Sequence, residues 1–246
     1  MRNDCLNRKL KVSVVIPALD EEQQIGRCLE SLARQTFGDF EVIVVDNGSK
    51  DATASIARAC GASTIYEPRH GIPYARETGF QAARSDIIAS TDADTEVPAS
   101  WLQRIFQTFL EDPQVVAVFG PYCYKPLSRR RSLGVLLIPY LSTALMFSQR
   151  IAWRFGHPYF SGANFAVRQE AFLEAQGFRS PKDNQIYSVW EDVQLGMKLH
   201  QLGKVCYLSD LVVLTSARKL RPANARTILI GTPKKALRVQ VMGKDL

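Results

Sequence analysis

The first half of the chain alternates short apolar runs with segments of helical periodicity. The apolar runs predict strands at residues 12–16, 41–45, 62–66, 86–91 and 115–119. Between the first two runs, Ile25, Cys28, Leu29 and Leu32 recur at the spacing of one helix face. Strands that alternate with helices of about a dozen residues are typical of βαβ units. The pattern therefore predicts an α/β fold with a mainly parallel sheet.

The second half of the chain has a less regular pattern. It predicts a strand at 160–167, helices at 168–176 and 192–202, and late strands at 204–208 and 211–215. Residues 133–147 form a nearly uncharged run with basic flanks at 129–131 and Arg150. This run is shorter than the ~20 residues that a helix needs to span a bilayer. It predicts either a buried helix or an element at a membrane surface.

Composition is that of a globular protein. Of the 246 residues, 46% are hydrophobic and 22% are charged, which excludes wholesale disorder and a polytopic membrane protein. The five cysteines are scattered and never spaced as CxxC, so they indicate neither a disulfide framework nor a zinc site. The polar first eleven residues show no secretory signal. We therefore expect a reducing compartment and a cytoplasmic location.

The chain is basic. Lys and Arg number 31 against 24 Asp and Glu, a net charge of +7. Such a surplus suits anionic partners such as nucleotides, phospholipid headgroups or nucleic acid, and does not choose among them. Residues 221–246 are predicted to be a basic C-terminal tail. Because no aromatic residues are interleaved with the basic ones, nucleic acid is not the expected partner.

Carboxylates follow three of the predicted strands. Asp20 and Glu21 follow the first strand, Asp46 follows the second, and Asp92 and Asp94 follow the fourth. In an open α/β sheet, ligands bind beyond the carboxyl ends of the strands. Residues i and i+2 at a strand end point the same way, so Asp92 and Asp94 are expected to face one Mg²⁺ or Mn²⁺. The absence of GxGxxG and GxxxxGK[ST] from the sequence counts against a Rossmann dehydrogenase and a P-loop NTPase.

Six motifs occur in an order that resembles glycosyltransferase family 2, the inverting enzymes of the GT-A fold. They are VSVVIPALDEE, VVDNGSKDAT, GIPYARETG, STDADTEVP, SGANFAVRQEAF and WEDVQLGMKL, and together they span roughly residues 10–220. The resemblance implies a single domain with a Rossmann-like, mainly parallel sheet flanked by helices. Residues 1–120 would form its nucleotide-sugar-binding half and residues 121–220 its acceptor-binding half.

The resemblance also implies a role for each matching residue. The donor nucleotide would be contacted at the strand ends and by one arginine, at Pro17, Ala18, Asp20, Glu21, Asp46, Arg76 and Asp92. Within that set, Asp46 would accept a hydrogen bond from a uracil-like imide. The metal would be bound by Asp92 and Asp94, and it would ease the departure of the diphosphate.

On the acceptor side, the resemblance assigns Gly162 and Asn164, with Asp192 as the catalytic base beside Glu191. Trp190, next to this pair, would either stack on an acceptor sugar or pack in the core. The base has independent chemical sense. An acceptor hydroxyl must lose a proton as it attacks the anomeric carbon, and a positioned carboxylate can take that proton. A helix N-terminus favours the ionised form of such a carboxylate.

The sequence departs from the family pattern at two places. Glu77 follows Arg76, where the family typically has Asn. Residues 214–219 contain no His, where many relatives carry a further metal ligand. Arg218 would either hold the leaving phosphates by charge or belong to the basic tail.

These observations predict an inverting glycosyltransferase that moves a sugar from a nucleotide diphosphate sugar, expected to be a UDP-sugar, with Mg²⁺ or Mn²⁺. The acceptor hydroxyl is expected on a lipid-linked or cell-envelope glycan, at an anionic surface on the inner face of the cytoplasmic membrane. Three alternatives stay open. They are a catalytically silent GT-A-like nucleotide-binding or scaffold protein, a nucleotidyltransferase, which usually has a Gly-rich phosphate loop, and a nucleic-acid binder that uses the tail.

Overall fold

The computed structural model describes residues 11–125, 143–144, 146–147, 150–151, 153–156, 160–180, 184–186 and 190–220, without the side chains of 219 and 220. Most of the apolar run 133–147, its arginines at 129–131 and the basic tail 221–246 lie outside the described residues. Among the helices in the described ranges, none combines the length and the apolar character needed to cross a bilayer.

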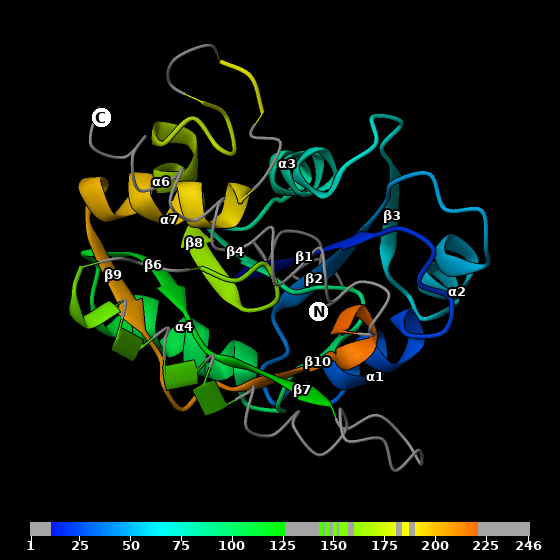
Figure 1. The fold of residues 1–246 in the computed structure, drawn as a ribbon, viewed down its shortest axis with the longest axis horizontal. Coiled ribbons are helices and arrows are strands. Elements are labelled where there is room, and N and C mark those ends of the chain that lie inside the picture. The colour runs from blue at the N-terminus through cyan, green and yellow to red at the C-terminus, as the bar shows by residue number, and fades with distance from the viewer. Residues whose placement is uncertain are drawn as a thin grey trace, which may run out of the picture.

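The centre of the fold is a seven-stranded sheet with helices on both faces (Figure 1). In spatial order its strands are β3 (Ser63–Tyr66), β2 (Phe40–Asp46), β1 (Val12–Ala18), β4 (Ile87–Ser90), β8 (Phe165–Arg168), β6 (Val115–Phe119) and β9 (Lys204–Tyr207). Strands β1 to β4 are parallel to their neighbours within that group, as are β6 and β9, and only β8 is antiparallel to both of its neighbours. The predicted α/β fold with a mainly parallel sheet is confirmed.

Three further strands form a smaller sheet. Its order is β5 (Thr95–Glu96), β10 (Val213–Ser216) and β7 (Tyr122–Lys125). The sequence pattern did not predict β5 or β7, because two to four residues are too few to show a period. This sheet brings the end of the described chain back to the segment that follows β4, since Thr215 pairs with Thr95.

The helices form two layers (Figure 1). One layer contains α3 (Ile72–Ala82), α6 (Gln169–Glu174) and α7 (Glu191–Leu202), and the other contains α1 (Ile25–Ala33), α2 (Thr53–Ala59) and α4 (Trp101–Glu111). A short 3-10 helix, η2 (Ala217–Leu220), follows β10. The helices predicted around residues 25–32, 168–176 and 192–202 are present, with bounds that differ by a few residues.

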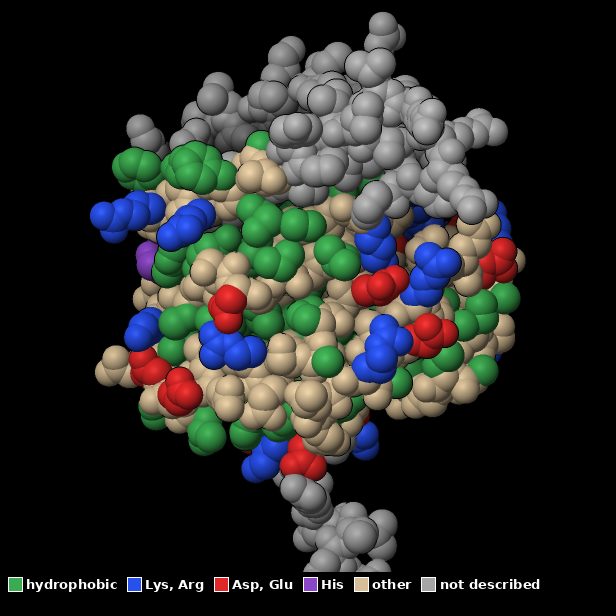
Figure 2. Space-filling model, turned by 90° about the horizontal axis from the view of Figure 1, so that it is seen from below, with side chains coloured by type: hydrophobic (Ala, Val, Ile, Leu, Met, Phe, Trp, Pro, Cys, Tyr) green, Lys and Arg blue, Asp and Glu red, His purple; other side chains and the backbone are tan. Residues whose placement is uncertain are grey.

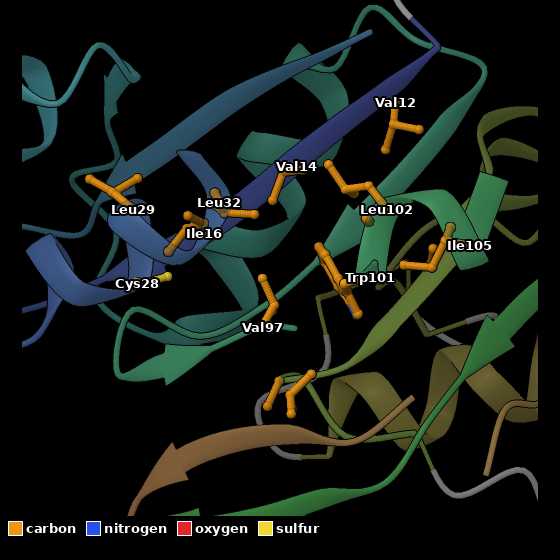
Figure 3. Packing of buried hydrophobic residues seen from close by; sticks show 14 of the residues in the cluster. Val12, Val14, Ile16, Cys28, Leu29, Leu32, Val97, Trp101, Leu102 and Ile105 are labelled. Carbon is orange, nitrogen blue, oxygen red and sulfur yellow. The ribbon is translucent and has the colours of Figure 1, made fainter. Parts of the chain in front are cut away.

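Strand β1 serves both layers at once. Val12, Val14 and Ile16 pack in the cluster that contains α1 and α4, and Val15 packs in the cluster that contains α3 and α7. Figure 3 shows the first set, with Trp101 of α4 and Leu32 of α1 directed toward the strand. Side chains alternate across a strand, so a strand covered on both faces reads as an unbroken apolar run.

The predicted strand at 160–167 begins only at Phe165. Residues 160–164 form a turn instead, in which the Asn164 amide N–H donates to the Ser161 carbonyl at 2.9 Å. The apolar character of this segment reflects its burial, not a strand period. The turn matters because it places Gly162 beside the site described below.

Charged side chains of both signs are mixed on the surface. On the face seen in Figure 2, Lys and Arg lie beside Asp and Glu, and no continuous basic stripe of the described residues is visible there. Nucleic-acid-binding proteins carry such a stripe as their electrostatic footprint. The net charge of the chain is therefore not concentrated on this face.

Helix α3 packs unusually close to the sheet at Gly79. A Cβ atom at this position would overlap Val15 and lie 2.9 Å from Cγ2 of Val45. Gly26 in α1 is different, since the nearest atom to an added Cβ is 3.9 Å away. The two glycines thus allow opposite predictions for the same substitution.

We expect Gly79→Ala to lower the free energy of unfolding by about 1–3 kcal/mol, because the methyl group must push α3 away from the sheet. Gly26→Ala should raise it by up to about 1 kcal/mol, because alanine loses less backbone entropy in a helix. Thermal unfolding of both variants measures the difference. Equal effects from the two substitutions would contradict the close approach of α3.

Candidate functional site

The carboxyl ends of β1, β2 and β4 meet at one edge of the sheet, as the sequence predicted. Ala18 is paired with Asp46 in the register of β1 and β2. The Asn47 N–H extends this pairing with a hydrogen bond to the Ala18 carbonyl at 2.9 Å. Pro17 and Ala18 are buried and form the floor of this edge.

Asp20 and Asp46 organise the turn that follows β2. Asp20 has a left-handed backbone conformation with φ 54°, and its Oδ1 accepts from the Lys50 N–H at 2.7 Å. Asp46 Oδ1 accepts from the Ser49 N–H at 3.0 Å, and the Ser49 hydroxyl accepts from the Asp20 N–H at 3.0 Å. The two predicted donor residues therefore lie at one turn.

Asn47 holds the loop before α3, a role that sequence reasoning did not assign. Its buried Nδ2 donates to the carbonyls of Glu67 at 3.0 Å and Arg69 at 2.7 Å, and its Oδ1 accepts from the Gly71 N–H at 2.7 Å. In the same loop, hydrogen bonds from Arg69 lower the pKa of the Glu67 side chain to about 2, so this carboxylate stays ionised. The position of Asn47 just after the strand-forming run 41–45 was the available signal.

Arg76 lies at the centre of the site. Its side chain is 2% exposed, its Nη2 lies 2.9 Å from Asp92 Oδ1, and its Nη1 pairs with Glu191 Oε1. Burial alone would lower the pKa of Arg76, but Glu191, Asp92 and Asp192 reverse the effect and raise it. The guanidinium is therefore a permanent buried cation between two carboxylates from distant segments.

Gly162 leaves room for that guanidinium. A Cβ atom at this position would overlap Nη2 of Arg76 and lie 2.7 Å from its Cζ. Because both ends of the guanidinium are held by carboxylates, the group cannot move aside without losing an ion pair. Gly162, predicted for the acceptor side, is thus required by the packing of Arg76.

Asp192 lies in the first turn of α7 and faces the 160–164 turn. Its Oδ2 accepts from the Gly162 N–H at 2.6 Å and its Oδ1 from the Val193 N–H at 2.8 Å. Burial, with a contribution from Glu191, raises the pKa of Asp192 to about 6, and Arg76 opposes the rise. The carboxylate is thus ionised at neutral pH and can accept a proton. Trp190, just before it, has a left-handed backbone conformation with φ 59°.

Asp94 takes different partners from Asp92. Its carboxylate is 3% exposed, and its Oδ1 accepts from the Thr215 hydroxyl at 3.1 Å. Arg218 Nε lies 3.7 Å from Asp94 Oδ2, and Arg218 Nη2 pairs with Glu21 Oε1. Thr215 and Arg218 belong to the predicted acceptor half, yet they lie at the edge formed by the carboxyl ends of β1, β2 and β4 (the donor edge). They reach it because β10 pairs with β5.

The two aspartates fit a divalent cation only in part. Strand β4 ends at Ser90, so strand alternation does not direct Asp92 and Asp94 toward one point, and Asp92 is engaged by Arg76. No group of three or more His, Cys, Asp and Glu side chains that could hold a metal occurs in the part of the chain that is described. Carboxylate oxygens nevertheless suit Mg²⁺ or Mn²⁺, which are commonly held by one or two carboxylates together with substrate phosphates. The donor set fits such an ion with a diphosphate present.

Asn164 has a structural role that sequence reasoning did not foresee. Its side chain is 1% exposed, its Oδ1 accepts from the Trp101 indole at 2.8 Å, and its Nδ2 donates to the carbonyls of Pro121 at 3.0 Å and Leu211 at 2.6 Å. An amide has two donors and one carbonyl oxygen, and these partners use them. Asn164 therefore joins α4 to the 121 and 211 segments and does not present its amide to a ligand.

Comparison with known proteins agrees with the resemblance drawn from the motifs. The sequence model of the family described as Glycosyl transferase family 2 matches residues 13–175. The chain is similar to the uncharacterized glycosyltransferase EpsJ of Bacillus subtilis strain 168, with 32% identity over 49% of this chain and 36% of the relative. It is also similar to the uncharacterized glycosyltransferase Rv0539 of Mycobacterium tuberculosis, with 31% identity over 66% of this chain and 70% of the relative. In the first two curated relatives, the matched region spans only about a third of their length.

Solved structures share the fold. The mannosyltransferase PcManGT from Pyrobaculum calidifontis, in complex with GDP-Man and Mn²⁺, has a TM-score of 0.66 and 24% identity, covering 94% of this chain and 65% of that one. Glucosyl-3-phosphoglycerate synthase from Mycobacterium tuberculosis, in complex with Mn²⁺, UDP-Glc and phosphoglyceric acid, has a TM-score of 0.62 and 22% identity over 89% of this chain and 77% of that one. These likenesses establish the GT-A fold.

We expect Arg76→Met to lower the free energy of unfolding by about 3–5 kcal/mol, because it leaves the buried Glu191 carboxylate and the half-buried Asp92 carboxylate without their cation. A carboxyl group that holds its proton more tightly in the folded state adds stability at low pH that is lost as the pH rises. The loss should therefore be smaller at about pH 5 than at about pH 8. Denaturant unfolding at both pH values measures it.

Arg84→Met is the matched control. Arg84 also pairs with a glutamate, at 2.6 Å from Glu41, but the Arg84 side chain is 72% exposed. Glu41 is 9% exposed and keeps a hydrogen bond from the Ser13 hydroxyl at 2.7 Å when Arg84 is replaced. Because the cation itself is exposed to water, its loss should change stability by only about 1 kcal/mol. A loss at Arg76 no larger than the loss at Arg84 would refute the central position of Arg76.

Proposed function

The chain belongs to glycosyl transferase family 2, and on that basis we propose that it is an inverting glycosyltransferase that uses a nucleotide diphosphate sugar. The observation that carries the proposal is the placement of Asp192. Its carboxylate is held by the Gly162 and Val193 N–H groups and lies one residue from Glu191, which shares Arg76 with Asp92 of the donor edge. The Arg76 guanidinium thereby connects the segment that carries Asp192 to the donor edge.

The donor nucleotide would bind at the carboxyl ends of β1, β2 and β4. Asp46 would receive the base, with Pro17, Ala18, Asp20 and Glu21 around the base and ribose. Mg²⁺ or Mn²⁺, held by Asp94 and Asp92, would supply charge neutralisation of the leaving diphosphate. Arg218 lies next to Asp94 and would contact the phosphates by charge. PcManGT was solved with GDP-Man and the glucosyl synthase with UDP-Glc, so the donor class is open to test, and we propose a UDP-sugar.

The reaction would be a single displacement. The acceptor oxygen forms a bond to the anomeric carbon as the bond from that carbon to the phosphate oxygen of the donor breaks. Asp192 takes the hydroxyl proton, and the electron pair leaves with the nucleoside diphosphate. Attack from the face opposite the leaving group inverts the anomeric centre. Gly162 and Trp190 would border the acceptor, with residues 121–220 as the acceptor-binding half.

A catalytically silent nucleotide binder is the second candidate, and one observation favours it. Arg218 occupies the neighbourhood of Asp94 with a fixed positive charge, in a chain that has no His at residues 214–219. If that charge replaces the cation, the donor edge would bind a nucleotide without the metal chemistry. The following titration separates the two candidates.

We expect UDP, titrated by calorimetry, to bind at least about tenfold more tightly with Mn²⁺ than without it, because the cation shares the diphosphate charge. Asp94→Ala should abolish this metal-dependent gain. Asp192→Asn should keep UDP binding but lose sugar transfer, since the amide accepts no proton. Transfer by the unmodified protein should fall as the pH is lowered through the Asp192 pKa of about 6.

GDP is the comparison ligand in the same titration. Tighter binding of GDP would keep the fold and change the donor class. UDP binding that Mn²⁺ does not alter would support the silent candidate. Retention of transfer by Asp192→Asn would eliminate Asp192 as the base.

We also propose that the acceptor is presented at an anionic membrane surface. Every described position between 143 and 154 is helical. Phe147 and Phe155 are 64% and 75% exposed, Ile151 lies between them at the same spacing, and Arg150 and Arg154 are exposed beside them. Apolar side chains with basic neighbours on one helix are typical of elements that lie in a membrane interface. A lipid-linked acceptor would bring its hydroxyl to the site from such a surface.

Vesicles that contain phosphatidylglycerol should cosediment with the protein at low salt, and binding should weaken as salt is added. Phe155→Asp should reduce this binding severalfold, because it places a negative charge at the interface. Leu110→Asp is the control, since Leu110 is 68% exposed but belongs to α4 and not to this segment. Equal binding by the two variants would eliminate the helix as the membrane contact.

A further inference from the structure

Glu77 follows Arg76 on α3 but faces a different segment. It is buried, and its Oε2 accepts from the Phe178 N–H at 3.1 Å. Its Oε1 accepts from Gln81 Nε2 at 2.8 Å and lies 3.4 Å from Arg179 Nε. Glu77 therefore binds the 175–179 turn, which follows α6, and not the nucleotide edge where the motif alone would place it.

Lys198 binds the same turn from α7. Its Nζ donates to the carbonyls of Ala175 at 2.7 Å and Arg179 at 2.9 Å, and also to the carbonyl of Gly177. An ammonium has three hydrogens, and each of them has a carbonyl acceptor here. Burial lowers the pKa of Lys198 to about 8, which still leaves the group mostly protonated at neutral pH.

The turn between these two side chains is tightly constrained at Gly177. Gly177 has φ 58°, and a Cβ atom there would lie 2.7 Å from Glu77 Oε2 and 2.9 Å from Cζ of Phe172. The backbone of the turn is thus hydrogen-bonded on two sides. The Phe178 N–H donates to the Glu77 carboxylate, and three carbonyls accept from the Lys198 ammonium. Charge-assisted hydrogen bonds of this kind are about twice as strong as neutral ones.

The two helices that grip the turn are the same two that build the site. Helix α3 carries Arg76, which holds Glu191, and α7 carries Asp192 six residues before Lys198, about 9 Å along the helix axis. Because Lys198 belongs to α7 and binds three carbonyls of the turn, a shift of the turn would change the position of α7.

We propose that Glu77 and Lys198 form a clamp on the 175–179 turn that positions α7, and with it Asp192 in the first turn of that helix. Both are positioning residues, since they act through the turn and touch neither donor nor acceptor. The inference rests on the proposed function for the importance of Asp192. The clamp itself is tested without substrate.

Hydrogen exchange followed by mass spectrometry tests the clamp in the full chain. Lys198→Met should speed amide exchange in residues 175–180 by about tenfold or more, because three carbonyls lose their donor and the turn is held less tightly. Lys198→Arg keeps the charge and N–H donors, so exchange should be slower than in Lys198→Met. Glu77→Gln should loosen the same residues. The substitution removes the negative charge and replaces one acceptor oxygen with an NH2 group, which cannot accept from Gln81 or pair with Arg179. Exchange in β1 should not change in any variant.

Lys204→Met is the matched control. Lys204 also makes an ion pair, at 2.8 Å from Asp112, but its side chain is 56% exposed on β9. Exchange in residues 175–180 that is unchanged in Lys198→Met, or changed equally in Lys204→Met, would overturn the clamp. If Lys198→Met does not fold, exchange in Glu77→Gln is compared with exchange in Lys198→Arg. Faster exchange in Glu77→Gln supports the clamp, and unchanged exchange in Glu77→Gln overturns it.

The functional readout is a split between binding and turnover. UDP with Mn²⁺ should bind Lys198→Met within about twofold of the unmodified protein, because the clamp does not reach the donor edge. Release of nucleoside diphosphate from the sugar donor should fall about tenfold and recover in Lys198→Arg. If UDP binds neither protein, the proposed donor is wrong, yet the exchange measurement still decides the clamp.

Discussion

The buried Arg76 guanidinium is the interaction on which the site depends. It connects Asp92, in the turn after β4, to Glu191, at the start of α7, and these two residues are far apart in the sequence. A buried charge is tolerated only when it is paired and hydrogen-bonded, so the position of each carboxylate is set by the other. The two halves of the domain are thereby held in one relative arrangement at the point where donor and acceptor would meet.

Other features of the site follow from that pairing. Gly162 must lack a side chain because the guanidinium fills the space beside it, and its N–H is then free to bind Asp192. Asp192 is half-buried beside Glu191, so desolvation and the neighbouring charge raise its pKa to about 6, while Arg76 limits the rise. A proton acceptor poised slightly below neutral pH results from burial and two neighbouring charges, without any residue dedicated to that purpose.

The remaining polar residues serve to place the elements that carry the site. Asn47 holds the loop before α3, Asn164 joins α4 to two loops, and Glu77 with Lys198 grips the turn before α7. The resemblance to the family implies that Asn164 faces an acceptor. The structure surrounds its amide with protein partners instead. Buried polar groups need such partners, so a residue within a motif can hold the architecture together without contacting a ligand.

Local pattern determined much of this protein. The alternation of apolar runs and helical faces specified the strands and helices of the α/β sheet, and the motif order indicated the family and the edge where Asp46, Asp92 and Asp192 would act. Only the tertiary structure decided which partner each charge takes. Arg76 and Glu77 are adjacent, yet one turns to Glu191 and the other to Phe178, and Arg218 reaches Asp94 because β10 pairs with β5. Periodicity and turn chemistry are local properties of the sequence, whereas the pairing of buried charges depends on which side chains burial brings within hydrogen-bonding distance.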